Sequence, residues 1–421
     1  MALAEACPDG QPRALGLAVS GGGDSMALLR AGAQWAQRRR AAVFVATVDH
    51  GLRPEAASEA AFVAETCAAL DLPHHVLTAP QEAELAGSGN LQGAARSLRY
   101  GLLSDWARDL ELSHVALAHT MDDQAETVLM RLARGSGVDG LSAMSALRHA
   151  DGLYWLRPFL GLRRADLRDA LGHWDQEWVE DPSNEDTRFD RIKARKALTH
   201  LGPLGLDVAR LARTAQIMSD ARAALQSTTQ TLAARAANID DGDVLLDQTL
   251  LAQAPFDIRA RLLAHALGWV SGAVYRPRLR ALQAVMDRLA EGRTQTLQGC
   301  LLTVRDNQIR VAREPAAVSD LCTPAPGIWD GRWRIVWQPS ADDTATPAPQ
   351  GLHLRPTGDS TVLTLTPGQR GTLPRSSRAA LPAVWEGDRL VAAPLPGVSD
   401  GNWGLVPLKD GADFTTSLMA D

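Results

Sequence analysis

The feature that most constrains the fold is an alternation of short apolar runs and longer helix-like segments through roughly the first half of the chain. Strands are expected at residues 15–19, 43–48, 74–78 and 114–118, with helices at 26–38, 55–70 and 91–110. This alternation predicts an α/β domain with a parallel sheet that helices cover on both faces. Ligands bind such sheets at the carboxyl ends of the strands, so the loops that follow the strands are the candidates for function.

Two breaks divide the rest of the chain. The first, at residues 200–207, contains glycine and proline, and the second, at 314–327, holds three prolines. Near the second break, Asp330-Gly331 predicts a hairpin turn between tryptophans. These tryptophans are expected to pack in a core, and stacking on RNA bases is the alternative. The expected domains are a parallel-sheet nucleotide-binding domain over 1–202, a mostly helical middle domain over 208–312 and a small mostly-β domain over 326–421.

Composition excludes several classes of protein. Among the 421 residues no apolar run approaches the roughly 18 residues of a membrane span, and the amino terminus has no apolar stretch typical of a secretory signal. The net charge of −6 argues against non-specific coating of nucleic acid but not against a local basic site. The four cysteines are scattered without a CxxC pair, so a reducing cytoplasm is the expected location.

A glycine-rich turn joins the first expected strand to the first expected helix. It reads Ser20-Gly21-Gly22-Gly23-Asp24-Ser25 and is called the glycine loop below. Glycines let the backbone turn tightly and approach a ligand, and the start of a helix favours an anion. A plain turn capped by Ser20 or Asp24 is the alternative. Serines at both ends and an acid inside favour phosphate binding, although the lysine of a Walker A loop is absent.

A second polar stretch follows the fourth expected strand. His119 ends that strand, and Asp122, Asp123 and Glu126 lie in the first turns of the next expected helix. A capping box made by Thr120 and Asp123 would account for one acid. Two adjacent acids and a histidine beside a phosphate loop exceed what a cap needs. Such carboxylates can hold Mg²⁺ against phosphates or accept a proton from an amine.

These stretches resemble, in their order along the chain, the motifs of the tRNA(Ile)-lysidine synthases. That family belongs to the PP-loop, or N-type, ATP pyrophosphatases, which cleave ATP between the α and β phosphates and adenylate a carbonyl oxygen. The resemblance is dense over about residues 15–200 and weaker beyond. Besides the glycine loop it rests on VDHGLR (48–53), ARSLRY (95–100), HTMDDQAET (119–127), RGSG (134–137), RPFL (157–160) and EDPSN (180–184).

The resemblance implies a two-step reaction on the wobble cytidine of tRNA(Ile) with a CAU anticodon. ATP adenylates the C2 oxygen of the base and releases diphosphate, and the ε-amino group of free L-lysine then displaces AMP. ATP and Mg²⁺ are the implied cofactors. The resemblance implies that Asp24, His119 and Asp123 are catalytic, that Asp24 and Asp123 hold Mg²⁺, and that the glycine loop binds ATP. It also implies that the middle and last domains bind tRNA, and it allows a homodimer.

Further residues are implied to contact cytidine or tRNA. From the second and third motifs these are Asp49, His50, Arg96 and Arg99, and from the basic segment after EDPSN they are Arg188, Arg191, Lys193 and Arg195. A cationic helix face can follow a phosphate backbone, although such a face is also often only solvated. The sequence departs from the family at Ile192, where an asparagine usually follows the arginine.

Three other functions stay open on the residues alone. A tRNA thiolase on the same scaffold would need a persulfide-carrying cysteine or a cysteine-bound cluster, which the cysteine spacing does not supply. An amidotransferase-type synthetase would need a glutaminase domain. A non-catalytic tRNA-binding protein would not need both the glycine loop and the acidic stretch, and ATP–pyrophosphate exchange would separate it from an enzyme.

Overall fold

The computed structural model describes residues 12–49, 56–78, 91–180, 190–273, 275–339, 347–359, 362 and 373–419. The chain divides into two compact units, residues 1–223 and 224–420. The finer domain boundaries at 202, 208–312 and 326–421 stay predictions. Two residues assigned to the substrate, His50 and Arg188, lie outside the described residues.

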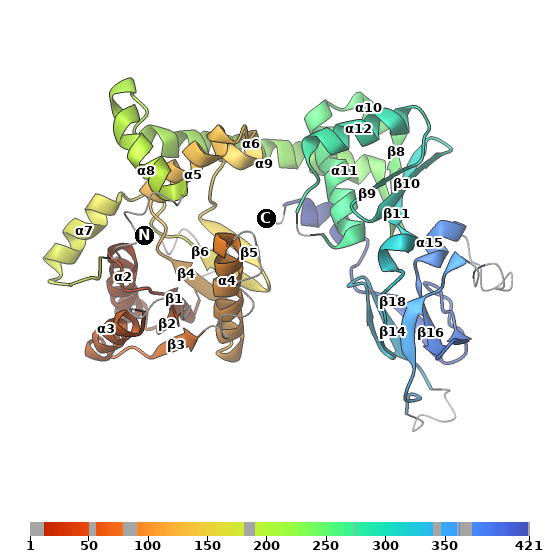
Figure 1. The fold of residues 1–421 in the computed structure, drawn as a ribbon, viewed down its shortest axis with the longest axis horizontal. Helices are drawn as coiled ribbons and strands as arrows, with labels where there is room; N and C mark the ends of the chain where they lie inside the picture. The colour runs from red at the N-terminus through yellow and green to blue at the C-terminus, as the bar shows by residue number, and fades with distance from the viewer. Residues whose placement is uncertain are drawn as a thin grey trace. The chain divides into compact units, whose positions relative to one another are not determined.

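A six-stranded sheet forms the centre of the first unit (Figure 1), in the order β3-β2-β1-β4-β6-β5. All neighbours pair in parallel except β5, which is antiparallel to β6. Because β1 lies between β2 and β4, the strand order reverses there, and a ligand crevice is expected at the carboxyl end of β1. The strands are β1 (Ala14–Ala18), β2 (Ala42–Asp49), β3 (His74–Thr78), β4 (His114–Leu117), β5 (Leu147–Ala150) and β6 (Leu153–Leu156).

Helices cover both faces of this sheet, as predicted. Leu15 and Leu17 of β1 pack in one core with α2, α3 and α7, whereas Ala18 packs on the other face with Trp106 of α4. Gly16 lets that indole approach, since a Cβ there would lie 2.8 Å from a ring carbon of Trp106. The helices along this part of the chain are α2 (Gly23–Arg39), α3 (Ala56–Ala69), α4 (Leu91–Asp109), α5 (Met121–Ala133), α6 (Val138–Leu141), α7 (Arg164–His173), α8 (Asp190–Leu201) and α9 (Val208–Ala236), which continues past residue 223 into the second unit, with a 3₁₀ turn at Gly202–Leu204.

The second unit begins with helices packed on an antiparallel sheet in the order β7-β8-β11-β10-β9. Its buried core includes Leu262 and Leu267 of α11 and Val311 of β11, so apolar residues from helix and sheet exclude water together. These elements are β7 (Ala237–Asp240), β8 (Asp243–Asp247), α10 (Gln248–Gln253), α11 (Phe256–Ser271), α12 (Leu279–Ala290), β9 (Gln295–Leu297), β10 (Cys300–Arg305) and β11 (Gln308–Arg313).

Two small sheets follow, β12-β15-β16-β17 and β13-β14-β18, so the mostly-β carboxyl-terminal region is confirmed. Asp330 and Gly331 both have positive φ in the predicted hairpin, and Trp329 pairs with Trp333 across it, both buried. The elements are η4 (Pro315–Val318), β12 (Thr323–Pro324), β13 (Gly327–Trp329), β14 (Trp333–Trp337), β15 (His353–Pro356), α15 (Arg375–Ala379), β16 (Pro382–Glu386), β17 (Arg389–Ala392), β18 (Trp403–Pro407), α16 (Asp413–Thr416) and η5 (Ser417–Met419). Across the described residues, no helix has the length and apolarity needed to cross a membrane.

Candidate active site

The glycine loop leaves β1 and starts α2, as its sequence predicts. Gly21 has φ +87°, which side chains rarely adopt, and Gly22 precedes the first turn of α2 in an extended conformation. The Ser25 hydroxyl donates to the Gly22 carbonyl at 2.8 Å and accepts from the Ser20 N–H at 3.1 Å. These bonds hold the loop in place while the first N–H groups of α2, which a helix leaves without intrahelical acceptors, stay available to an anion.

Substitutions at two neighbouring glycines of the loop distinguish the effect of backbone strain on stability from the effect of lost space on ligand binding. Gly21→Ala is expected to destabilise the protein by about 1–2 kcal/mol, because alanine is strained at positive φ. At Gly22 the backbone φ is −72°, which alanine adopts without strain. An added Cβ in Gly22→Ala would have one neighbour within 4 Å, the Ser20 hydroxyl at 3.9 Å. This variant should therefore keep its stability but weaken ATP binding, since Gly22 lines the cavity described below. Chemical denaturation and nucleotide titration of both variants check this, and equal ATP affinity in Gly22→Ala and wild type would contradict it.

The acidic stretch begins α5 with the capping box that Thr120 and Asp123 were expected to form. Asp123 Oδ2 accepts from the Thr120 N–H at 2.8 Å and from its hydroxyl at 2.9 Å. The other oxygen, Oδ1, lies 3.4 Å from Nη2 of Arg164 and 4.0 Å from Nη1 of Arg191. One carboxylate thus caps the helix with one oxygen and presents the other to two cations.

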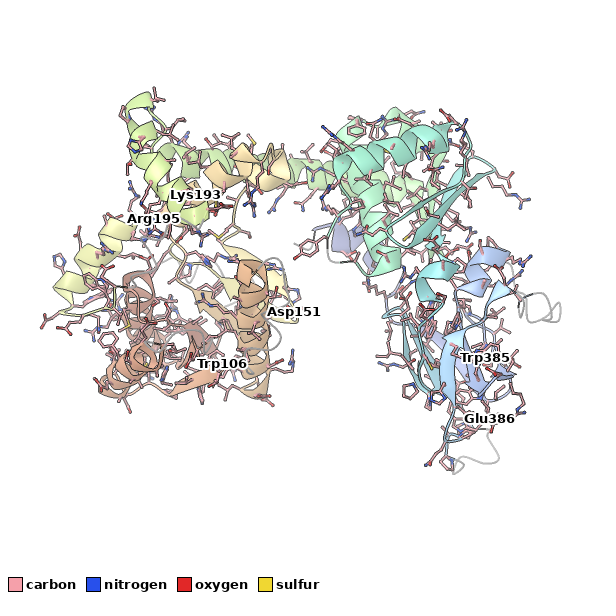
Figure 2. All side chains as sticks on the ribbon, in the orientation of Figure 1. Trp106, Asp151, Lys193, Arg195, Trp385 and Glu386 are labelled. Atoms are coloured by element: carbon pink, nitrogen blue, oxygen red, sulfur yellow. The ribbon has the colours of Figure 1, made fainter. Side chains whose placement is uncertain are left out.

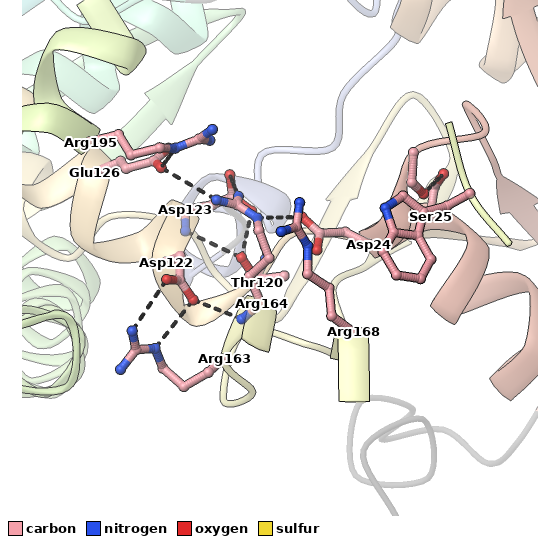
Figure 3. A network of polar contacts seen from close by, with 12 residues as sticks. Asp24, Ser25, Thr120, Asp122, Asp123, Glu126, Arg163, Arg164, Arg168 and Arg195 are labelled. Carbon is pink, nitrogen blue, oxygen red and sulfur yellow. Dashed lines mark hydrogen bonds and ion pairs between the residues drawn. The ribbon is translucent and has the colours of Figure 1, made fainter. Parts of the chain in front are cut away.

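Arg164 connects this helix to the glycine loop (Figure 3). Its Nε donates to Asp24 Oδ2 at 2.9 Å, and its Nη1 lies 3.7 Å from Oε1 of Glu126, which is only 1% exposed. Asp122 faces away from these acids, toward the start of α7, where it accepts from the Arg164 N–H at 2.8 Å. The two adjacent aspartates therefore have different partners.

Two cations of α8 complete the cluster. Arg195 donates to Glu126 Oε1 at 2.8 Å, and Arg191 lies 3.4 Å from Glu126 Oε2. Figure 2 labels Arg195 and Lys193 on the same helix; Lys193 is exposed and pairs with Asp190 of its own helix at 3.4 Å. We call the set of Asp24, Asp123, Glu126, Arg164, Arg191 and Arg195 the acid–arginine network. Ile192, which lies between Arg191 and Arg195 in the sequence, is buried. An apolar side chain therefore fits at this position, where the family usually has asparagine.

One cavity of about 350 Å³ is lined by residues of the glycine loop and by four members of the network, Asp24, Asp123, Arg164 and Arg195. Its lining is polar and comes from the ends of β1 and β4, the start of α2, and helices α3, α4, α5, α7 and α8. The lining residues are Ala18, Ser20, Gly22, Gly23, Asp24, Ser25, Glu59, Arg99, Leu117, Ala118, His119, Asp123, Arg164, Arg168, Val179, Glu180 and Arg195.

Burial shifts the titration of the side chains in this cavity. Desolvation lowers the pKa of His119 to about 3, so its ring is neutral at physiological pH. Desolvation raises the pKa of Asp24 and of Glu126, although arginines oppose the shift in both. Burial alone would also raise the pKa of Asp123, but the surrounding cations, Arg191 first, outweigh burial and lower it. Asp123 is therefore held firmly in its charged form.

The residues implied to meet cytidine or tRNA lie in different places. Arg99 lines the cavity, one helical turn from Arg96, which is exposed and lies over the Tyr100 ring at 5.1 Å. Asp49 ends β2 and is half-buried outside the lining. Sequence reasoning assigned no role to Arg164, although it follows the RPFL motif by only a few residues.

The acids fit a hard cation that arrives with phosphates. Asp24 Oδ1 is buried and has no hydrogen-bond partner among the described residues. The described part of the chain holds no group of three or more His, Cys, Asp or Glu side chains arranged for a metal ion. Mg²⁺ is commonly held by one or two carboxylates together with substrate phosphates, so Asp24 and Asp123 have the chemistry for that mode.

Known proteins resemble this chain both in the domain that forms the site and along most of its length. The PP-loop domain family matches residues 2–201. A tRNA(Ile)-lysidine synthase from Ruegeria pomeroyi is 46% identical over 97% of this chain and 94% of its own length. The chain belongs to the tRNA(Ile)-lysidine synthase family. A second member of this family, from Methylobacterium nodulans, is 42% identical over 71% of the chain and 90% of its own length.

Two solved structures that resemble this member of the lysidine synthase family share less of its sequence. The U34-tRNA thiolase NcsA from Methanococcus maripaludis aligns with a TM-score of 0.43 at 13% identity, over 49% of this chain and 72% of the thiolase chain. The NH3-dependent NAD synthetase from Campylobacter jejuni aligns with a TM-score of 0.31 at 19% identity, over 52% of this chain and 90% of the synthetase chain.

Proposed function

We propose that the chain ligates lysine to C2 of the wobble cytidine of tRNA(Ile) with a CAU anticodon and forms lysidine. The observation that carries this proposal is that the glycine loop and Asp123 line one cavity at the ends of neighbouring strands, in a chain of this family. ATP supplies the activation, free L-lysine is the nucleophile, and the reaction takes place in the cytoplasm. A homodimer, which the family resemblance allows, is tested by the mass of the protein in solution.

The first step places a polyphosphate in the cavity. The C2 oxygen of cytidine attacks the α-phosphorus of ATP, an O–P bond forms, and diphosphate leaves with the electrons of the broken bond. Backbone N–H groups of the glycine loop receive phosphate oxygens, because the start of α2 is positive. Asp24 and Asp123 would hold Mg²⁺, which when bound neutralises charge on the phosphates. Cations of the network meet charge that develops on the leaving group.

The second step needs an uncharged amine. The ε-amino group of lysine has an ordinary pKa of about 10.4 and must lose a proton before its nitrogen attacks C2 and AMP departs. His119 is held neutral by burial, and no described residue bonds its Nδ1. We assign it the role of a hydrogen-bond partner for substrate. We assign Arg99, which lines the cavity, to cytidine binding. We assign the same role to Arg96, which belongs to the same motif, and to Asp49 and His50 of the motif at residues 48–53.

The decisive experiment is mass analysis of tRNA nucleosides. Incubation of the protein with ATP, lysine and tRNA(Ile) carrying a CAU anticodon should convert its wobble cytidine to lysidine, with one AMP and one diphosphate per modified base. Omitting lysine should stop the reaction at the adenylated tRNA. No new nucleoside together with tight tRNA binding would contradict the proposal and favour a binding protein. A thiolated nucleoside in a parallel incubation supplied with sulfide would contradict it and favour a thiolase.

A further inference from the structure

Arg164 stands at the centre of the acid–arginine network. Each of its three guanidinium nitrogens faces a different carboxylate: Nε meets Asp24 at 2.9 Å, Nη2 meets Asp123 at 3.4 Å, and Nη1 meets Glu126 at 3.7 Å. Figure 3 shows the guanidinium between Asp24 and Asp123. Because Asp24 belongs to the glycine loop and the other two acids to α5, this one side chain joins the two motifs.

The backbone of Arg164 is anchored independently of its side chain. Its N–H donates to Asp122 Oδ2 at 2.8 Å, and the guanidinium of Arg163 lies 3.3 Å from the same carboxylate. The first residue of α7 is therefore fixed in place while the long side chain reaches into the cavity. The Arg164 side chain is 20% exposed and lines the cavity together with Ser20 and Gly22 of the glycine loop.

Only one of the three contacts has the length of a strong charge-assisted bond. Such bonds between a cationic nitrogen and a carboxylate are typically about 2.7–2.9 Å, so those to Asp123 and Glu126 at 3.4 and 3.7 Å are loose. The network also balances three acids with three arginines. A polyphosphate entering beside Asp24 and Asp123 would bring further negative charge next to both acids, and a cation would have to meet it. Arg164 is tethered at that place and is loosely bound.

We propose that Arg164 is a substrate-binding residue that changes partners. In the free protein it holds the three acids together. When ATP enters, its guanidinium turns to phosphate oxygens of the nucleotide, and Asp24 and Asp123 are left to hold Mg²⁺. This role rests on the proposed function, since it requires ATP in this cavity. A guanidinium suits the task because its five donors can bind two phosphate oxygens at once.

The test compares Arg164→Gln with wild type using two simple probes. Inorganic pyrophosphate in the presence of Mg²⁺, followed by calorimetry, reports on phosphate binding; we expect the variant to lose roughly tenfold to a hundredfold in affinity, the size of one or two charge-assisted bonds. Mn²⁺ alone, followed by electron paramagnetic resonance, reports on the acids. We expect the variant to bind Mn²⁺ about tenfold more tightly than wild type, because the acids no longer have Arg164 as a competing cation.

The matched control is Arg163→Gln, which removes the same charge one residue away but leaves the three acids paired with Arg164. Its Mn²⁺ affinity should equal that of wild type. Unchanged pyrophosphate affinity in Arg164→Gln would overturn the proposal. So would a loss of pyrophosphate binding without a gain in Mn²⁺ binding, which would indicate a merely structural residue. Wild type that fails to bind Mg²⁺–ATP at all would instead refute the proposed function.

Discussion

Asp123→Asn is expected to lower the rate of ATP–pyrophosphate exchange in the presence of tRNA by roughly a thousandfold, with little change in melting temperature. The asparagine oxygen can keep both bonds from Thr120, so the cap of α5 persists and stability falls by at most about 1 kcal/mol. The amide nitrogen, however, would replace Oδ1 and point N–H groups at Arg164 and Arg191. Losing one preorganised charge at a reacting phosphate commonly costs a hundredfold to a thousandfold.

The control for this variant is Asp166→Asn. Asp166 occupies the corresponding position in α7, where its carboxylate accepts from the Arg163 N–H at 3.1 Å, but it is exposed and outside the cavity. It should lose a similar, small amount of stability and keep its exchange rate. If Asp123→Asn behaved like Asp166→Asn in both measurements, Asp123 would be only a helix cap.

Local sequence signals predicted the parts of the site that depend on local backbone. The glycines of the loop predicted a tight turn between a strand and a helix, and Gly21, three residues after the end of β1, makes that turn with a positive φ. The capping box required Thr120 and Asp123 three residues apart at a helix start, and the structure contains it. The alternation of strands and helices likewise predicted the parallel sheet, because period and length are properties of short segments.

The acid–arginine network was not predictable in the same way. Arg164 is 140 residues from Asp24 in sequence, and only the docking of α7 beside the glycine loop brings them to 2.9 Å. Glu126 was visible in the acidic stretch, but its burial depends on α8 packing against α5. The basic segment appeared from its spacing as a possible surface stripe. The structure instead places Arg191 and Arg195 against a buried acid, a tertiary arrangement that charge spacing on one helix cannot reveal.

Because Arg191 and Arg195 contact buried Glu126, neutralising these two arginines is expected to affect both tRNA binding and the cavity. Each of Arg191 and Arg195 has one edge against Glu126, yet their side chains are 38% and 36% exposed. We propose that the exposed edges contact tRNA phosphates. The double variant Arg191→Gln, Arg195→Gln is then expected to lose about a hundredfold or more in tRNA affinity, the size of two charge-assisted contacts. Its salt dependence should flatten by roughly 0.7–0.9 in log–log slope per lost phosphate contact.

The same double variant should also bind ATP more weakly, because it removes both α8 arginines from buried Glu126, leaves that acid with the 3.7 Å contact of Arg164, and alters the cavity that Arg195 lines. Lys193→Gln, Lys196→Gln is the matched comparison: it removes two charges from the exposed side of α8 and should reduce tRNA affinity alone. Filter binding of tRNA at several salt concentrations and ATP titration check both variants. Parallel salt slopes and unchanged tRNA affinity in the arginine variant would mean that these cations interact only with the acids Glu126 and Asp123, and that tRNA is bound by other surfaces of the chain.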